Sequence, residues 1–213
     1  MLLLAACGGS SSNGEASKTA AQVVKDAVAA ASAASAVHVS GKITSSGTPL
    51  QLDLHLAGSK DAKGSISENG LRFDLVRVGD SAYIRGSDAF YRKLGGGGAV
   101  ALLHGRWIKA SATSGQFGQL GQLTDLKALF AAVSGGKRTL VNKGETTYAG
   151  KKAIEIDDTS HDGKLYVAAT GKPYPLALVG GGANSGTISF DGWNESVSIA
   201  APAKALDLSA LGG

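Results

Sequence analysis

The most regular stretch of the chain is Leu50-Gln51-Leu52-Asp53-Leu54-His55-Leu56, in which leucine alternates with a polar residue. Successive side chains point to opposite faces of a β-strand, so this period of two predicts a strand with one buried and one solvated face. The preceding residues 37–44 alternate in the same way, and Ser46-Gly47 is a turn signal between the two segments. Together the two segments predict an antiparallel hairpin.

Further alternating segments follow this hairpin. Residues 64–68 end at Asn69-Gly70, a pair that favours a two-residue hairpin turn because both residues tolerate positive φ. Residues 71–78 and 81–85 are predicted as the next two strands. Within residues 71–78 the apolar positions change phase at Leu75-Val76, which predicts a β-bulge or a strand that wraps around a core.

The C-terminal part of the chain also has the pattern of short strands separated by glycine-containing turns. We predict strands over residues 138–141, 146–149, 152–157, 164–168, 176–179, 187–190 and 196–199. The residues from Pro202 onward are predicted to form a short tail. Apolar residues alternate with polar ones in these segments, which is typical of antiparallel sheets with one buried face.

Two segments have helical periodicity. Residues 18–36 are rich in alanine, their apolar residues follow i, i+3, i+4 spacing, and Ser17 is the predicted N-cap. Thr124 is the predicted N-cap of a second helix over residues 125–133, which carries one apolar stripe. That stripe could be ordinary core packing or a lid over an apolar cavity.

The residues between the two groups of strands have the weakest pattern. Gly95–Gly98 predicts a loop or a mobile edge, and residues 99–103 predict a helical turn. The aromatic residues Phe90, Tyr91 and Trp107 could line the mouth of a cavity or fill the core.

Strands that follow one another, with helices inserted between two groups of them, predict an α+β fold rather than βαβ units. Many antiparallel strands with few helices can bury their inner faces only if the sheet curls. A curled sheet capped by helices encloses a cavity, as in barrels that hold apolar ligands. We expect residues 18–213 to form one such domain and to be a monomer.

The N-terminal residues Leu4-Ala5-Ala6-Cys7 form a lipobox, the pattern that directs lipidation of a cysteine in bacterial lipoproteins. Cys7 is the only cysteine of the chain, and a Gly/Ser-rich run over residues 8–17 predicts a flexible tether. Residues 1–7 are too short for a whole signal segment, so we expect the true start to lie upstream. Two acyl chains on Cys7 would anchor the protein to the outer face of the cell membrane.

The overall composition excludes several classes of function. The chain has 213 residues, of which 43% are hydrophobic and 18% charged, with a net charge of +4. No run of 18 apolar residues predicts a membrane span, and no cluster of basic residues predicts a nucleic-acid surface. The mild positive charge could serve solubility or attraction to an anionic membrane.

The sequence offers little that predicts catalysis or metal binding. The histidines are isolated in the sequence, and their positions on polar strand faces or in loops indicate solvated side chains; they are His38, His55, His104 and His161. Asp157-Asp158 beside His161-Asp162 could bind a divalent cation, although such residues are more typical of turns. Gly180–Gly182 lacks the context of a phosphate loop. We therefore predict no enzyme activity, no metal and no cofactor.

Several short segments resemble the LppX/LprG-type lipoproteins of mycobacteria and other actinobacteria, within the wider LolA-like superfamily of lipoprotein carriers. The segments that carry the resemblance are residues 37–41, 78–84, 105–108, 164–168 and 171–175. The resemblance implies a curved antiparallel half-barrel with helices covering its concave face. It also implies that the protein binds acyl chains of lipids or lipoproteins and is not an enzyme.

These expectations lead to two hypotheses. In the first, the protein carries an acyl lipid between the sheet and its helices. The predicted lining residues are Leu52, Leu54, Leu71, Phe73, Leu75, Ile154, Ile156, Leu165 and Val167 on the sheet and Leu126, Leu129 and Phe130 above it. In the second, the protein is a regulatory or scaffolding lipoprotein that binds a partner protein of the envelope. An apolar void favours the first hypothesis, and a filled core with an exposed apolar patch favours the second.

Overall fold

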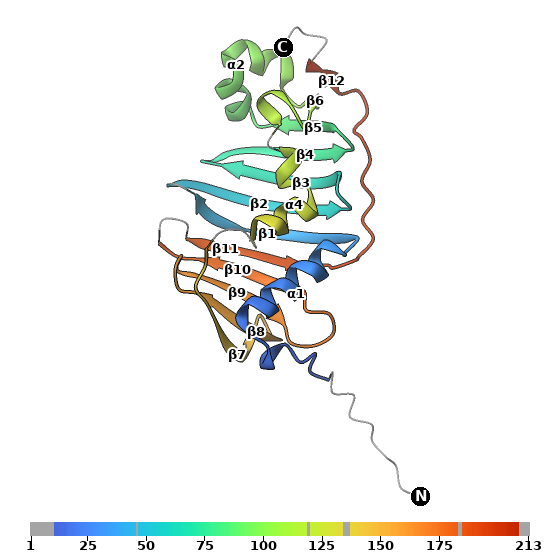
Figure 1. The fold of residues 1–213 in the computed structure, drawn as a ribbon. Helices are drawn as coiled ribbons and strands as arrows, with labels where there is room; N and C mark the ends of the chain where they lie inside the picture. The colour runs from blue at the N-terminus through green and yellow to red at the C-terminus, as the bar shows by residue number, and fades with distance from the viewer. Residues whose placement is uncertain (1–10, 46, 119, 134–136, 183–184, 209–213) are drawn as a thin grey trace, which may run out of the picture.

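The structure is a computed structural model that describes residues 11–45, 47–118, 120–133, 137–182 and 185–208 (Figure 1). Cys7, the predicted signal segment and residues 8–10 of the predicted tether lie outside the described residues. No helix in the described part of the chain is both long enough and apolar enough to cross a bilayer.

The strands form a single sheet. They are β1 (Ala36–Ser45), β2 (Thr48–Ala57), β3 (Asp61–Glu68), β4 (Leu71–Val78), β5 (Ser81–Gly86), β6 (Ile108–Ser111), β7 (Leu140–Tyr148), β8 (Lys151–Asp158), β9 (Gly163–Ala168), β10 (Pro175–Gly180), β11 (Gly186–Asp191) and β12 (Leu206–Asp207). Their order in the sheet is β12-β6-β5-β4-β3-β2-β1-β11-β10-β9-β8-β7. The sheet therefore consists of two antiparallel meanders joined where β1 pairs with β11, plus one parallel pair between β12 and β6.

The helices lie mainly on one face of this sheet. They are α1 (Ala20–Ser32), α2 (Asp88–Leu103), α3 (Leu120–Leu123) and α4 (Leu126–Val133), with the 3-10 turns η1 (Glu15–Ser17) and η2 (Gly115–Phe117). Helices α1 and α4 contact each other in front of the sheet, whereas α2 lies at its β5–β6 end (Figure 1). The sheet is curved and open rather than closed, so the predicted α+β half-barrel is confirmed.

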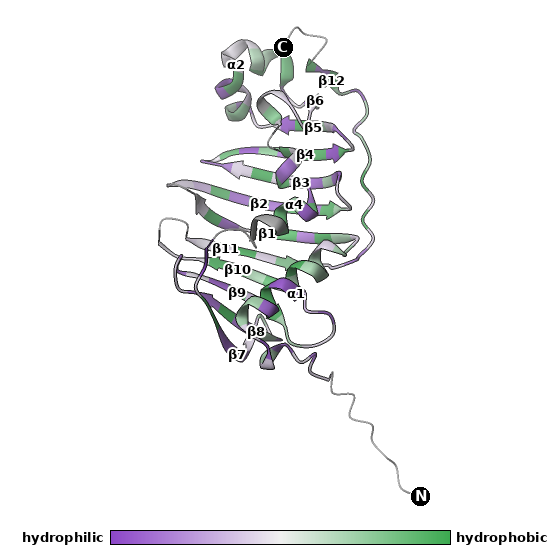
Figure 2. Cartoon of the chain, in the orientation of Figure 1, coloured by the Kyte–Doolittle hydropathy of each residue, from purple (hydrophilic) through white to green (hydrophobic). Residues whose placement is uncertain are grey.

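The alternation along the strands positions the core. Leu52, Leu54 and Leu56 of β2 are at most 6% exposed, while Asp53 is exposed and His55 is half-buried. Figure 2 shows hydrophobic and hydrophilic residues alternating along strands of the sheet. The buried residues form two groups. We call the first the main core, with Leu52, Leu54, Leu56, Leu75, Ile84, Tyr91, Ile108, Leu126, Phe130 and Phe190 among its members. We call the other the second core, formed by Ala20, Val23, Ala27, Ile154, Ile156, Leu165, Val167 and Ala169.

Helix α1 begins later than predicted and is capped by a different residue. The hydroxyl of Thr19 accepts a hydrogen bond from the Gln22 amide, which makes Thr19 the N-cap. Ser17 instead donates to the Gly14 carbonyl within η1. The helix ends at Ser32, so the predicted range of 18–36 was too long at both ends.

The predicted phase change on β4 was wrong. The pairing of β4 with β3 and β5 runs without a register shift, and Arg77 continues the inward series after Leu75. Arg77 is only 3% exposed, because its guanidinium donates to the carbonyls of Gly79 and Gly121 and to the hydroxyl of Thr124. A charged residue with enough backbone acceptors can occupy an apolar position.

Two predictions in the middle of the chain were also wrong. Gly95–Gly98 lies inside α2, where non-helical backbone at Gly95 and Gly96 kinks the helix, with a φ of 68° at Gly96. Thr124 is not the cap of α4. The Asp125 carboxylate accepts from the amides of Lys127 and Ala128 and takes that position instead.

The C-terminal strands differ from the prediction at three places. Residues 138–141 and 146–149 were predicted as two strands, but β7 is one strand with an irregularity between Asn142 and Gly144. Residues 196–199 form no strand, because this part of the chain runs across the strand ends (Figure 1). The predicted tail contains β12, which pairs with β6.

The segment before η1 is attached to the sheet. Ser12 forms a β-bridge with Thr170, and the Asn13 side chain donates to the Ala168 carbonyl at 2.8 Å. Glu15 is 2% exposed and receives a hydrogen bond from Lys18. Residues 12–17 of the predicted tether are therefore attached to the sheet or folded beside it.

Candidate ligand-binding site

The predicted lining residues, apart from Leu71, fall into two groups in the structure. Leu52, Leu54, Leu75, Leu126 and Phe130 belong to the main core, and Phe73 and Leu129 pack against it. Ile154, Ile156, Leu165 and Val167 belong to the second core below α1. Leu71, at the first position of β4, is half-buried and is a member of neither described group.

These residues pack against one another in the structure. The core members among them are at most 7% exposed. The Phe130 ring of α4 lies 5.1 Å from the Phe190 ring of β11 and 5.7 Å from the Trp193 ring, measured between centroids. Below α4, the roof and the floor are thus in direct contact through aromatic side chains.

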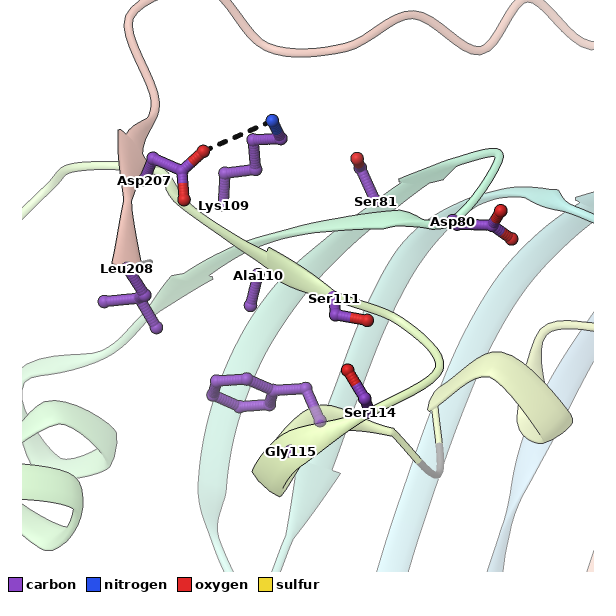
Figure 3. Close-up of a pocket in the computed structure, with 10 residues that line it drawn as sticks. Asp80, Ser81, Lys109, Ala110, Ser111, Ser114, Gly115, Asp207 and Leu208 are labelled. Carbon is purple, nitrogen blue, oxygen red and sulfur yellow. Dashed lines mark hydrogen bonds and ion pairs between the residues drawn. The ribbon is translucent and has the colours of Figure 1, made fainter. Parts of the chain in front are cut away.

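A pocket of about 650 Å³ lies instead at the β6 end of the sheet (Figure 3). It is lined by Asp80, Ser81, Lys109, Ala110, Ser111, Ser114, Gly115, Phe117, Asp207 and Leu208. None of these residues was predicted from the sequence. Asp80 and Ser81 come from the β4–β5 turn and the start of β5. The other lining residues lie in or next to β6, η2 and β12, whose segments are too short or too rich in glycine to give a clear periodic signal.

The local structure of β6 explains why a pocket forms there. Strand β5 covers one edge of β6 along its whole length, but β12 pairs only with Ile108 and Lys109 on the other edge. Ala110 and Ser111 therefore lie on an edge to which no described strand is paired. The chain then turns at the fully buried Ala112, whose amide donates to the Asp80 carbonyl, and η2 follows beside that edge.

The pocket has an apolar side and a charged rim. Figure 3 shows Ala110 and Lys109 pointing to opposite sides of β6, as alternation along a strand requires. The Lys109 ammonium lies 3.3 Å from a carboxylate oxygen of Asp207. Both side chains are 39% exposed, and exposed pairs of this kind contribute about 0–1 kcal/mol, so the pair can rearrange around a polar group.

The apolar side of the pocket is continuous with the main core. Phe117 and Leu208 line the pocket and also pack against the main core. Leu120 and Leu123 of α3 do not line the pocket but pack against the same core. An apolar group that enters between η2 and β6 therefore meets side chains that pack directly against the main core.

The aromatic residues that could have lined a cavity mouth lie elsewhere. Tyr91 is fully buried, and its hydroxyl accepts from the Gly86 amide and donates to the Arg106 carbonyl. Burial raises the pKa of Tyr91 above its ordinary value. Phe90 packs on Phe73 with centroids 5.0 Å apart, and Arg85 lies over the Trp107 ring at 4.8 Å. Tyr91 therefore belongs to the core, and none of these residues lines the pocket at β6.

The acidic turn that offered a possible cation site forms a local hydrogen-bond network. The Asp158 carboxylate accepts from the amide and hydroxyl of Ser160, and one of its oxygens lies 3.0 Å from His161 Nδ1. Burial raises the pKa of Asp158, but these hydrogen bonds outweigh that effect and the pKa is lowered. The carboxylate thus stabilises the turn between β8 and β9.

No protein-family model matches the chain, and no curated protein matches it in sequence. Among solved structures, LprF from Mycobacterium bovis is 14% identical; the match covers 90% of this chain and 99% of LprF, with a TM-score of 0.63. The lipoprotein LppX from Mycobacterium tuberculosis is 16% identical, with coverage of 84% and 97% and a TM-score of 0.51. The chain therefore has the fold of these LppX/LprG-type proteins, as the resemblance in the sequence predicted.

Proposed function

We propose that this protein is a membrane-anchored lipoprotein that binds the acyl chain of a lipid or of an acylated molecule without chemical change. The observation that carries the proposal is the pocket of about 650 Å³ at β6 and η2, whose apolar lining residues Phe117 and Leu208 pack against the main core. Sites for small ligands usually have about 300–1,000 Å³ and combine apolar walls with a few polar groups. The shared fold with a lipoprotein supports the proposal but does not carry it.

In the proposed complex the hydrocarbon tail contacts Ala110, Phe117 and Leu208. Removal of apolar surface from water contributes about 25 cal/mol per Å² and provides the driving force. A carboxylate or phosphate head group would accept a hydrogen bond from Lys109 at the rim, in exchange for its bond to Asp207. Longer tails would extend toward Leu120 and Leu123, which are only partly buried.

The anchor is the second part of the proposal. Cys7 carries the acyl groups, and the sheet is attached from Ser12 onward. The intervening residues span at most about 17 Å when fully extended. The β7–β9 end of the sheet would then lie close to the bilayer, with the pocket at the opposite end of the molecule (Figure 1). Such an arrangement presents the cargo away from the anchoring membrane.

Binding of a dansyl-labelled fatty acid to the purified protein tests the ligand. We expect saturable binding at one site, and native mass spectrometry should show a copurified lipid. The variant Ala110→Phe places a ring in the pocket and should weaken binding at least about tenfold, a loss of roughly 1.4 kcal/mol. The matched control Ala89→Phe, at an exposed position of α2, should bind like the wild type. Absence of saturable binding, or equal affinity of both variants, would contradict the proposal.

A separate experiment tests the anchor. Cys7→Ser should move the protein from the membrane fraction to the soluble fraction of the cells that produce it. The purified variant should still bind the fatty acid, because Cys7 lies outside the pocket. Retention of Cys7→Ser in the membrane fraction would show that lipidation of this residue is not the anchor.

One observation favours a second candidate, the binding of a partner protein. Leu94 and Leu102, both on α2, are 41% and 49% exposed, and α2 projects from the end of the sheet (Figure 1). Exposed leucines of this kind occur at protein interfaces. If α2 binds a partner, Leu94→Ser with Leu102→Ser should abolish crosslinking to that partner in cells and leave fatty acid binding unchanged.

A further inference from the structure

Two histidines that are 17 positions apart in the sequence lie face to face on the outer side of the sheet. His38 of β1 and His55 of β2 are direct cross-strand partners, and their rings stack with centroids 4.4 Å apart and an interplanar angle of 21°. Two imidazoles at one cross-strand position bring two nitrogen donors together on strands in the middle of the sheet. Sites on such rigid elements hold their ligands more accurately than sites on loops.

Two carboxylates complete this cluster, which we call the His38–His55 cluster: His38, Asp53, His55 and Asp191. His38 Nδ1 lies 2.9 Å from Asp191 Oδ1 on β11, and His38 Nε2 lies 3.0 Å from Asp53 Oδ1 on β2. One ligand atom each from His38, Asp53 and His55 lies within 4.8 Å of the others. The cluster therefore places two imidazole nitrogens and one carboxylate oxygen close enough to bind one ion after small side-chain rotations.

The roles of the two carboxylates differ in a way that matches metal sites. A histidine that binds a metal almost always donates its other N–H to a carboxylate or carbonyl, which fixes the ring. Asp191 holds His38 Nδ1 in this manner and leaves Nε2 directed toward Asp53. A metal ion between Nε2 and Asp53 needs the 3.0 Å separation to widen slightly, because ligand distances at zinc are about 2.0–2.2 Å in tetrahedral geometry.

We propose that His38, His55 and Asp53 bind a divalent transition-metal ion of the zinc type, with Asp191 positioning His38 and with water in the remaining coordination site. Imidazole nitrogen with carboxylate oxygen suits Zn²⁺ among the common metals. Binding replaces the proton on His38 Nε2, and that proton is released to solvent. The site lies on the face of the sheet opposite the main core, and the proposal is independent of lipid binding.

The charges around the cluster are compatible with a cation. Asp53 and Asp191 supply two negative charges, and Lys63 of β3 is the cationic residue that pairs with His55 across the strands. The Lys63 ammonium donates to the Ser198 carbonyl at 3.0 Å.

The alternative is that the cluster exists only for its own hydrogen bonds, with a protonated His38 between two aspartates. Burial lowers the pKa of His38, but its hydrogen bonds to Asp53 and Asp191 outweigh this and raise it. Such a network needs no second imidazole, so removal of His55 separates the two possibilities. A metal site loses a ligand, whereas the network of His38 keeps both of its partners.

Isothermal titration of the untagged protein with ZnCl₂ tests the proposal, in a Cys7→Ser background that removes the only thiol. We expect one equivalent of Zn²⁺ per chain, and affinity at least about tenfold lower in His55→Ala and in Asp191→Asn. The matched control is His104→Ala, because His104 also pairs with an aspartate, Asp88, at 2.6 Å but has no described second imidazole beside it. It should bind Zn²⁺ like the parent protein.

A second readout reports on the protein rather than on the heat of binding. Zn²⁺ should raise the Tm of the parent protein and of His104→Ala, but not that of His55→Ala. The metal-free Tm of each variant shows whether it is folded. The proposal is overturned if the parent binds no Zn²⁺, or if His55→Ala binds it with the same affinity and stoichiometry.

Discussion

The two ends of the apolar interior are covered in different ways. The second core is covered by α1, one continuous helix of 13 residues, which places the fully buried Val23 and Ala27 directly against the strands. The main core is covered by α3 and α4, helices of four and eight residues with larger side chains such as Leu126 and Phe130, together with residues of α2 and the last turn of α1. The pocket of about 650 Å³ lies at the main-core end, next to η2, which precedes α3 in the chain.

This difference indicates where the protein can adapt to a ligand. A helix of four or eight residues has little stability of its own in water, so α3 and α4 depend on their contacts with the sheet. One of those contacts is Arg77, which donates to Gly121 in α3 and to Thr124 between α3 and α4. We therefore expect the α1 end to act as a rigid frame and the α3–α4 end to move when a tail enters.

The largest effects should come from removing a buried side chain at each end. Phe130→Ala should lower the free energy of unfolding by about 3–5 kcal/mol, and Ile154→Ala by about 2–5 kcal/mol, because each leaves a cavity. Dodecanoate should then raise the Tm of Phe130→Ala more than that of Ile154→Ala, since the tail can fill only the cavity below α4. Thermal unfolding with and without the ligand measures both effects. Equal responses of the two variants would remove the distinction between the ends.

The next effect concerns the attachment of α3 and α4. Arg77→Met should lower the free energy of unfolding by about 2 kcal/mol, because it leaves the buried Gly121 carbonyl and Thr124 hydroxyl without the guanidinium. Hydrogen exchange should become faster in residues 120–133 and stay unchanged in α1. The control is Arg72→Met, at an exposed position of the same strand, which should change neither quantity. Faster exchange in α1 as well would show that the two covers are not independent.

The sequence predicted most of the sheet because alternation is a local signal. Residues 71–78 were predicted with the boundaries that β4 has. Of the four leucines in residues 50–56, Leu52, Leu54 and Leu56 are buried in β2 and Leu50 is half-buried. The error inside β4 came from the assumption that a buried position is apolar. The acceptors that satisfy Arg77 at that position include a carbonyl 44 residues away, which no local pattern reveals.

The sequence could not predict the candidate site for the same reason. The pocket depends on where β12, with two residues, meets β6, with four, and neither segment has enough residues to show a period. The pairing of His38 with His55 depends on the register of the β1–β2 hairpin, which alternation limits but does not fix. Each histidine by itself was interpreted as a solvated residue on a polar face.

A smaller effect tests the α1 cover alone. Thr19→Ala should lower the free energy of unfolding by about 1 kcal/mol, because it removes the side-chain acceptor for the Gln22 amide. Ser17→Ala, at the position that the sequence favoured as the cap, should stay within about 0.5 kcal/mol of the wild type. Urea unfolding measures both. A larger loss for Ser17→Ala would mean that η1, and not Thr19, fixes the start of α1.

The smallest effect is expected at the outer face, where the two meanders meet at β1 and β11. The pKa of His38 is raised in the folded protein, because the hydrogen bonds to Asp53 and Asp191 outweigh burial. A raised folded pKa contributes stability below the unfolded value of about 6.5, and this contribution is lost as the pH rises through the folded pKa. The wild type should therefore exceed His38→Gln in stability most at about pH 5 and least at about pH 8.

The titration of His55 has the opposite effect on the pH dependence of the free energy of unfolding, so the two histidines need separate measurements. Its pKa is lowered by burial and by the neighbouring His38 and Lys63, so protonation of His55 opposes folding as the pH falls below about 6.5. At about pH 5, the loss of unfolding free energy caused by His38→Gln should thus be larger in a His55→Gln background, where the opposing titration of His55 is absent. Urea midpoints measured in metal-free buffer across this range give the two differences. A difference that does not change with pH in either background would show that His38 is not held by the two aspartates, and that the junction of the meanders depends on apolar contacts alone.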